Sequence, residues 1–202
     1  MVFETYYFFK EHIFRIELMF DYLAPIYDLS LKIGNRYSAT PVLKNVEFES
    51  GDEVLDIGGG TGYLGDLMKK EFNLEYVVLD SNKKMLSKSK QKNIDTMILG
   101  NALNLPFKDQ SFDMILCVDA LHHFMEKTRA LEEMKRVLKD RGKIVILDLY
   151  PYLFLTKIIS WIERRAGEES EFLTPSEISR RLGLETDSFK VNHFQFLLKA
   201  KK

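Results

Sequence analysis

The chain has 202 residues, 29 Lys and Arg against 30 Asp and Glu, and 46% apolar residues. This length predicts one domain that buries roughly 70% of its unfolded surface. The formal net charge of -1 offers no general attraction to phosphate backbones, which argues against a nucleic-acid binder. The single cysteine, Cys117, cannot form an internal disulfide, as suits a reducing compartment.

No stretch of the sequence approaches the ~20 apolar residues that span a bilayer. The aromatic-rich segment 1–20 is interrupted by charged residues over 10–17, so it does not form a signal-peptide core. These features predict a cytoplasmic protein without a transmembrane segment.

The first half of the chain alternates between two periods. Residues 1–45 are predicted to form helices ahead of the first strand. Continuous apolar runs then predict strands, and spacings of three and four predict helices between them. The predicted order is a strand at 53–57, a helix at 63–71, a strand at 75–80, a Lys-rich helix at 82–92, and a strand at 94–99.

The second half continues this alternation. The predicted elements are a strand at 112–117, a helix at 126–139 ended by Gly142, a strand at 143–149, helices within 150–183, and two short strands within 184–199. Alternating strands and helices predict an α/β fold: a Rossmann-like, doubly wound, mostly parallel sheet with a small helical cap.

The same pattern predicts one domain over 1–202. Its expected parts are an N-terminal helical cap (1–45), a cofactor-binding core (52–150), a cap or lid insertion (151–183) and C-terminal strands (184–202). Ligands of such sheets bind beyond the carboxyl ends of the strands. The functional site is therefore expected around 56–62, 80, 100–102 and 118–123.

A glycine-rich turn follows the first strand and precedes a helix. A backbone without Cβ atoms allows a ligand to approach closely, and the helix start offers unpaired N–H groups. The dinucleotide fingerprint needs a third glycine where this chain has Tyr63, which disfavours a nicotinamide-dependent oxidoreductase. No Gly-Lys-Ser/Thr follows, which excludes a phosphate-binding P-loop.

Two carboxylates accompany this turn. Asp80 ends the second strand, where it can accept hydrogen bonds from both hydroxyls of a ribose. The alternative is a solvent-exposed acid or the cap of the Lys-rich helix. Asp56 lies in the first strand, where a buried carboxylate paired with nearby donors is the structural alternative.

The motifs together resemble those of class I S-adenosylmethionine-dependent methyltransferases, of the type that includes ubiquinone/menaquinone-biosynthesis C-methyltransferases. The resemblance rests on VLDIGGGTGYLG (54–65), YVVLD (76–80), GNALNLPFKDQSFDMILCVDALHHF (100–124), RVLKDRGKIVILDLYP (136–151) and FDYLAPIYD (20–28). It implies S-adenosyl-L-methionine as cofactor and S-adenosyl-L-homocysteine as product.

The resemblance also implies a set of cofactor-binding residues. The methionine part, ribose, adenine and far side of the cofactor would be contacted by Asp56, Gly58, Gly59, Gly60, Gly62, Asp80, Ser81, Met85, Asn101, Ala102, Val118, Asp119 and Tyr27. The family commonly has aspartate where this chain has Asn101, whose amide oxygen can still accept from the adenine amino group.

Methyl transfer requires alignment of donor and acceptor more than a dedicated catalytic triad. Where the acceptor loses a proton, a general base helps. His122 and His123 follow the fourth strand and are the leading candidates, with Asp119 and Tyr150 as further ones. The alternative is that LHHF forms a helical turn with one histidine packed and one solvated. The four histidines have no metal-ligand spacing, so no metal is expected.

Residues 150–166 form the most distinctive segment outside the cofactor motifs. An apolar stripe that includes Ile158 and Ile162 runs beside Trp161. Ordinary packing of a short cap explains it; a lid over a hydrophobic acceptor, with peripheral membrane contact, is the sharper hypothesis.

The sequence thus predicts methyl transfer to a small, apolar or aromatic molecule by a monomer or homodimer. Two alternatives stay open: a cofactor-binding protein without catalysis, and the disfavoured nicotinamide-dependent oxidoreductase.

Overall fold

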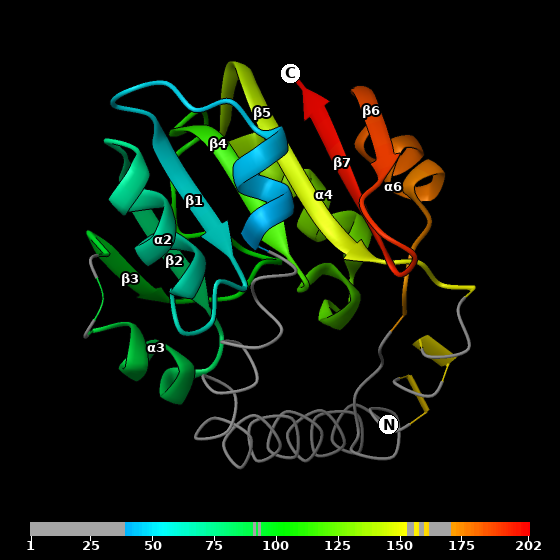
Figure 1. Cartoon of the computed structure of the whole chain (residues 1–202), viewed down its shortest axis with the longest axis horizontal. Coiled ribbons are helices and arrows are strands. Elements are labelled where there is room, and N and C mark those ends of the chain that lie inside the picture. Colours follow the sequence, from blue (N-terminus) through cyan, green and yellow to red (C-terminus); the bar gives the residue numbers. More distant parts are fainter. Residues whose placement is uncertain (1–38, 91, 93, 153–155, 158–159, 162–170) are drawn as a thin grey trace, which may run out of the picture.

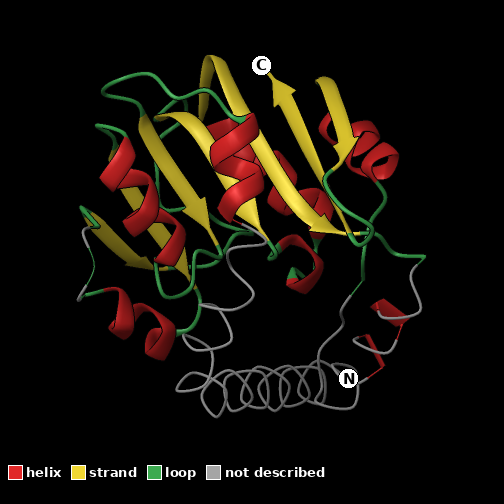
Figure 2. Cartoon of the chain, in the orientation of Figure 1, coloured by secondary structure: helices red, strands yellow, loops and turns green. Residues whose placement is uncertain are grey.

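A computed structural model describes residues 39–90, 92, 94–152, 156–157, 160–161 and 171–202. Within these residues, a twisted sheet lies between two layers of helices (Figures 1 and 2). Most of the predicted N-terminal cap, including Tyr27, lies outside the described residues.

The sheet has seven strands in the order β3-β2-β1-β4-β5-β7-β6. Their bounds are β1 Glu53–Ile57, β2 Glu75–Asp80, β3 Thr96–Leu99, β4 Phe112–Val118, β5 Leu138–Leu149, β6 Glu185–Lys190 and β7 Gln195–Lys201. The first five strands are parallel, and β7 is antiparallel to both β5 and β6. The predicted Rossmann-like, mostly parallel sheet is confirmed.

Helices cover both faces of the sheet, since each strand directs apolar side chains alternately to one face and to the other. The helices are α2 Tyr63–Glu71, α3 Lys83–Ser89, the short 3-10 helix η1 Leu121–His123, α4 Lys127–Val137 and α6 Pro175–Leu182. Residues 39–45 are also helical and share one buried cluster with α2, whereas α4 and α6 share the other. No helix among the described residues is both long and apolar enough to cross a bilayer.

Several element boundaries differ from the prediction by one to five residues. The largest difference, at the start of β5, arises because pairing within the sheet overrides local helical spacing. The helix predicted to 139 ends at Val137, and Leu138 already pairs with Phe112 as the first residue of β5. Gly142 therefore lies within the strand, where an added Cβ would come within 2.9 Å of the Asp113 carbonyl oxygen. The Lys-rich helix is also shorter than predicted, and it begins after Asn82, which caps it.

The C-terminal part of the predicted cap insertion belongs to the helical layer. Thr174 and Glu177 form a capping box that begins α6. Ile178 and Leu182 are then buried in the same cluster as the α4 side chains. This helix packs against a face of the sheet and does not extend over the strand ends. The two predicted C-terminal strands are observed as β6 and β7.

Candidate functional site

The carboxyl ends of the parallel strands meet at one edge of the sheet (Figure 1). This edge brings together the glycine turn after β1, Asp80 at the end of β2, the turn beginning at Gly100 after β3, and the 118–123 segment after β4. The register pairs Asp56 with Val78 and Asp80 with Leu99, so these segments are level with one another. The predicted site residues within the described chain therefore share one edge.

The four predicted glycines have different structural roles. An added Cβ at Gly58 would lie 2.6 Å from the Ala120 Cβ, and one at Gly59 would lie 2.6 Å from Asp56 Oδ2. Both positions thus allow close packing within the protein. Gly60 and Gly62 have φ values of 55° and 67°, in the left-handed region that favours glycine. These two shape the surface of the turn that a ligand would approach.

The start of α2 leaves hydrogen-bonding groups for a ligand. Its N-cap is Gly62, which has no side chain to accept from the first N–H groups of the helix. The Thr61 hydroxyl is buried, and among the described residues it has no hydrogen-bond partner. A buried unpaired hydroxyl beside an uncapped helix start fits a polar ligand such as the methionine part of a cofactor.

Asp56 lies beneath the glycine turn. Its side chain is buried, and Oδ2 accepts a hydrogen bond of 2.9 Å from the Tyr76 hydroxyl. Burial raises the pKa of Asp56 to about 7, against the opposing effect of the Tyr76 hydrogen bond. Asp56 is therefore a buried, paired carboxylate, which was the structural alternative offered by the sequence, and it supports the turn from below.

Asp80 holds the glycine turn against the start of α3. Its two oxygens accept from the backbone N–H groups of Gly60, at 2.8 Å, and Asn82, at 2.7 Å. Burial raises the pKa of Asp80, while these hydrogen bonds and the nearby His123 partly lower it. The cap of the Lys-rich helix is Asn82, whose Oδ1 accepts from Lys84 and Met85, so the capping alternative for Asp80 is wrong.

The residues predicted near the adenosine differ in exposure. Met85 and Ala102 are buried, whereas Ser81 and Asn101 are exposed. The Asn101 amide oxygen already accepts from the Leu103 N–H at 2.9 Å. Ala102 therefore offers a small apolar surface, and Asn101 stabilises the turn that carries it.

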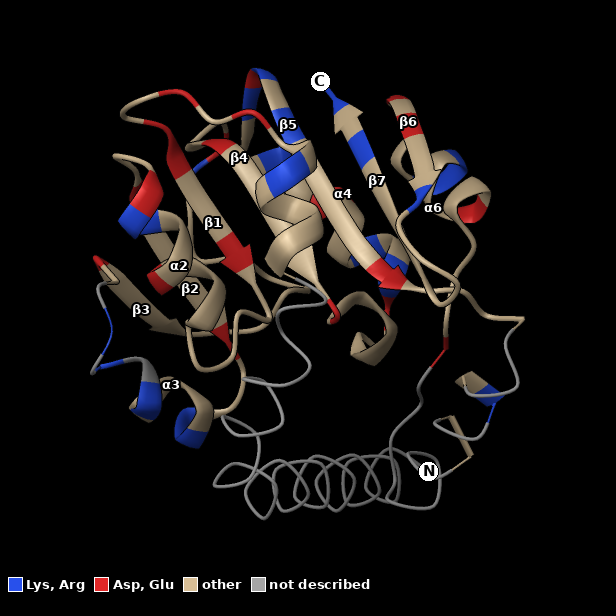
Figure 3. Ribbon diagram, in the orientation of Figure 1, with Lys and Arg blue, Asp and Glu red and all other residues tan. Residues whose placement is uncertain are grey.

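The lysines of the Lys-rich segment differ in their contacts. Lys83 and Lys84 on α3 are exposed, and Figure 3 shows the basic residues of this helix. Lys92 departs from that pattern because its ammonium group donates to the Thr61 carbonyl at 2.6 Å. One lysine of the run thus tethers the glycine turn.

The two adjacent histidines occupy different environments. His122 is buried, its Nδ1 lies 2.8 Å from Asp148 Oδ1, and its ring stacks on Phe172 with centroids 4.4 Å apart. His123 is half-buried and interacts electrostatically with Asp80. The alternative of one packed and one solvated histidine thus holds in part. His122 is packed, but it contacts a carboxylate that can orient its imidazole ring.

Asp119 and Tyr150 complete the set of predicted catalytic candidates. Asp119 follows Val118 at the end of β4 with a positive φ of 51°, and its Oδ1 accepts from Gln195 Nε2 at 3.2 Å. Val118 is half-buried. The pKa of Tyr150 is raised by burial and by Tyr152, which keeps its phenol protonated and favours a role in packing over one as a base.

Three residues of the site were missed from the sequence: Asp148, Phe172 and Gln195. Asp148 had a detectable signal, since it is a lone acid in the apolar run KIVILDL. Phe172 and Gln195 had none, because their partners are far away in the sequence. Phe172 stacks on His122, which lies 50 residues earlier in the chain, and Gln195 bonds to Asp119, which lies 76 residues earlier.

The proposed lid is described only in part. Ile158 and Ile162 lie outside the described residues, whereas Trp161 is 54% exposed. Among the residues that the structure places, no group of three or more His, Cys, Asp or Glu side chains could hold a metal ion.

Residues 55–146, from β1 into β5, match the family model of a methyltransferase domain. A demethylmenaquinone methyltransferase from Thermotoga maritima is 37% identical over 148 residues, which cover 70% of this chain and 63% of that protein. The chain thus spans less than two thirds of the length of this relative.

Solved structures agree on the fold. The YcgJ protein from Bacillus subtilis has a TM-score of 0.70 and 20% identity, covering 83% of this chain and 98% of that one. A phosphoethanolamine N-methyltransferase from Haemonchus contortus, in complex with S-adenosyl-L-methionine, has a TM-score of 0.68 and 18% identity. It is covered over 52% of its length, against 81% of this chain. The predicted fold class is therefore confirmed.

Proposed function

We propose that the chain transfers the methyl group of S-adenosyl-L-methionine to a small apolar aromatic acceptor of the quinol type. One observation carries the cofactor part: the uncapped start of α2 and the Asp80 carboxylate flank the same open glycine turn, with Gly60 N–H bound to Asp80. Asp80 would accept from the ribose hydroxyls, and Ala102 would contact the adenine.

The acceptor part rests on the aromatic character of the same edge. The Tyr150 and Tyr152 rings lie with centroids 5.0 Å apart, and Tyr152 is 65% exposed. Trp161 is also exposed among the residues after β5. Flat apolar surfaces suit an aromatic ring, and the Thermotoga maritima relative carries the name of an enzyme for demethylmenaquinone.

When bound, the cofactor would supply an electrophilic methyl group on a sulfonium sulfur; an electron-rich acceptor atom would take this group in line, and the sulfur would leave as a neutral thioether. The protein aligns the two partners and excludes water. We assign the general base to His122: with Nδ1–H donated to Asp148, Nε2 carries the lone pair that takes the acceptor proton. Phe172 stacks on the imidazole and keeps its plane fixed.

Thermal unfolding with added ligands tests the cofactor. S-adenosyl-L-methionine and S-adenosyl-L-homocysteine, at about a hundredfold excess over Kd, should raise Tm by about 5–10 °C, whereas NAD and NADP should not. Asp80→Asn should abolish most of this shift, and Asp187→Asn on the exposed face of β6 is the matched control. Stabilisation by NAD, or by none of these ligands, would overturn the assignment.

Methyl release separates an enzyme from a binding protein without catalysis. A reduced short-chain naphthoquinone is the probe, and transfer of the labelled methyl group is the measurement. His122→Asn should lower kcat by about 10²–10⁴ with little change in the affinity for S-adenosyl-L-methionine. Tight cofactor binding with no transfer to quinols, phenols or amines would favour the binding protein.

A further inference from the structure

The turn between β6 and β7 is docked onto the carboxyl edge of the sheet. The Asn192 side-chain oxygen accepts from the Phe194 N–H at 2.8 Å and from the Gln195 N–H at 2.9 Å. The Phe194 carbonyl in turn accepts from the Tyr150 N–H at 2.9 Å. The turn is thereby fixed both internally and to the end of β5.

Gln195 begins β7 with its side chain buried. The orientation of its amide is set by Asn192, whose Nδ2 donates to Gln195 Oε1 at 2.9 Å. Gln195 Nε2 is therefore the atom that faces Asp119, to which it donates at 3.2 Å. A carboxylate can only accept, so the contact has the correct polarity for ionised Asp119.

Asp119 needs such support because its backbone is strained. Its φ of 51° is uncommon outside glycine and costs about 1–3 kcal/mol where the surroundings maintain it. The Asp119 N–H is bound to the Leu147 carbonyl at 2.8 Å, which fixes the main chain. Gln195 fixes the side chain of the same residue. Asp119 directly follows β4, which lies next to β1, the strand that carries the glycine turn.

We propose that Gln195 is a positioning residue that holds the Asp119 carboxylate toward the sulfonium end of the cofactor. The C-terminal hairpin is then part of the donor site and favours the cationic cofactor over its neutral-sulfur product. The inference rests on the proposed function, since it presupposes that S-adenosyl-L-methionine binds at this edge. Charge attraction in a partly buried site supplies the discrimination.

Calorimetric titration with S-adenosyl-L-methionine and S-adenosyl-L-homocysteine tests this role. Gln195→Met removes the donor while keeping the length of the side chain, and Asp119→Asn removes the charge. Each should weaken binding of S-adenosyl-L-methionine by about tenfold and that of S-adenosyl-L-homocysteine by less than about twofold. In the double variant the losses should not add, because both act through one contact.

The matched control is Gln110→Met. Gln110 also donates to a carboxylate, Asp140 Oδ1 at 3.4 Å, but it is exposed near the start of β4. This variant should bind both ligands like the parent chain. Unfolding curves of all variants are recorded alongside, so that loss of fold is separated from loss of affinity.

Three results would overturn the inference. They are equal weakening for the two ligands, additive losses in the double variant, or unchanged binding in Gln195→Met that remains folded. If the parent chain binds neither ligand, the proposed function fails together with this inference. If the parent binds both and only the variants behave otherwise, the inference alone fails.

Discussion

Single acids within apolar strands are the clearest residue-scale markers of this site. Asp56 and Asp148 interrupt otherwise apolar strands, and both are buried with specific partners, Tyr76 and His122. Burying a carboxylate is costly unless it is paired or protonated. The two strands solve this problem differently: Asp148 orients an imidazole, whereas Asp56 has a pKa raised to about 7 by burial.

The raised pKa of Asp56 predicts a pH-dependent stability. Between the unfolded value of 3.8 and the folded value of about 7, the folded state alone keeps the proton, so stability falls as pH rises through this window. From about pH 5 to about pH 8 the loss should approach about 3 kcal/mol. Asp56→Asn should remove it, as measured by urea unfolding at both pH values.

The surface variant Asp66→Asn is the control for this comparison. Asp66 on α2 pairs with Lys70 and keeps contact with solvent. Its substitution should leave the pH dependence of unfolding as in the parent chain. An Asp56→Asn protein with the same pH dependence as the parent would refute the assignment of the slope to Asp56.

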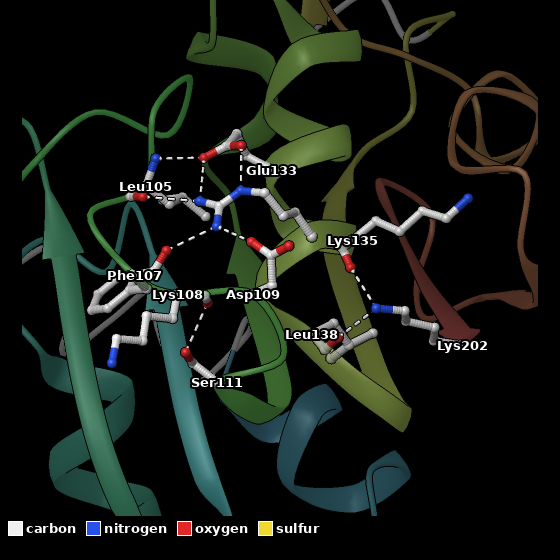
Figure 4. Close-up of polar contacts among 10 residues, drawn as sticks. Leu105, Phe107, Lys108, Asp109, Ser111, Glu133, Lys135, Leu138 and Lys202 are labelled. Carbon is white, nitrogen blue, oxygen red and sulfur yellow. Dashed lines mark hydrogen bonds and ion pairs between the residues drawn. The ribbon is translucent and has the colours of Figure 1, made fainter.

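At the scale of elements, α4 organises the loop between β3 and β4. Figure 4 shows Glu133 reaching this loop from the helix. Arg136 donates to the carbonyls of Leu105, at 3.0 Å, and Phe107, at 2.8 Å, and Glu133 accepts from the Leu105 N–H at 2.7 Å. The same loop begins with Asn101 and Ala102, so this pair links the helical layer to the adenine side of the site.

Replacement of Arg136 tests this link. Arg136→Lys keeps the charge but cannot donate to Leu105, Phe107 and Glu133 at once, so the free energy of unfolding should fall by about 1–3 kcal/mol. Arg129→Lys, at an exposed position of the same helix, should change it by less than about 0.5 kcal/mol. Urea midpoints provide the measurement, and equal midpoints for the two variants would contradict the role of Arg136.

Elements with strong local signals were predictable, and those fixed by distant partners were not. Buried parallel strands such as β1 and β2 appear as short, mostly apolar runs, and their bounds match the prediction. The end of α4 was misplaced because Leu138 suits a helix locally but pairs with Phe112 in the sheet. In the site, the glycine turn was visible in the sequence, whereas the Gln195–Asp119 contact joins segments with no shared local pattern.

At the scale of the whole molecule, the last strand of the sequence completes the interior of the sheet. β7 lies between β5 and β6, and its central residues, including Leu197 and Leu198, are fully buried on opposite faces. Both helical layers therefore depend on the C-terminal hairpin for part of their packing surface.

Leucine truncation in two strands tests this dependence. Leu198→Ala should lower the free energy of unfolding by about 2–5 kcal/mol, since it leaves a cavity in the core. Leu99→Ala on the edge strand β3, where the side chain is 58% exposed, should cost much less. Denaturant unfolding measures both. Similar losses in the two variants would show that β7 is not part of the cooperative core.

The position of β7 also bears on how the protein is made. During translation β5 is synthesised well before its neighbour β7, so β5 remains an open edge with apolar residues such as Ile144 and Ile146. Unpaired apolar edges invite pairing with other chains. The nascent protein thus passes through a stage in which association with other chains competes with completion of the sheet, and protection by chaperones matters most just before the C-terminal hairpin emerges.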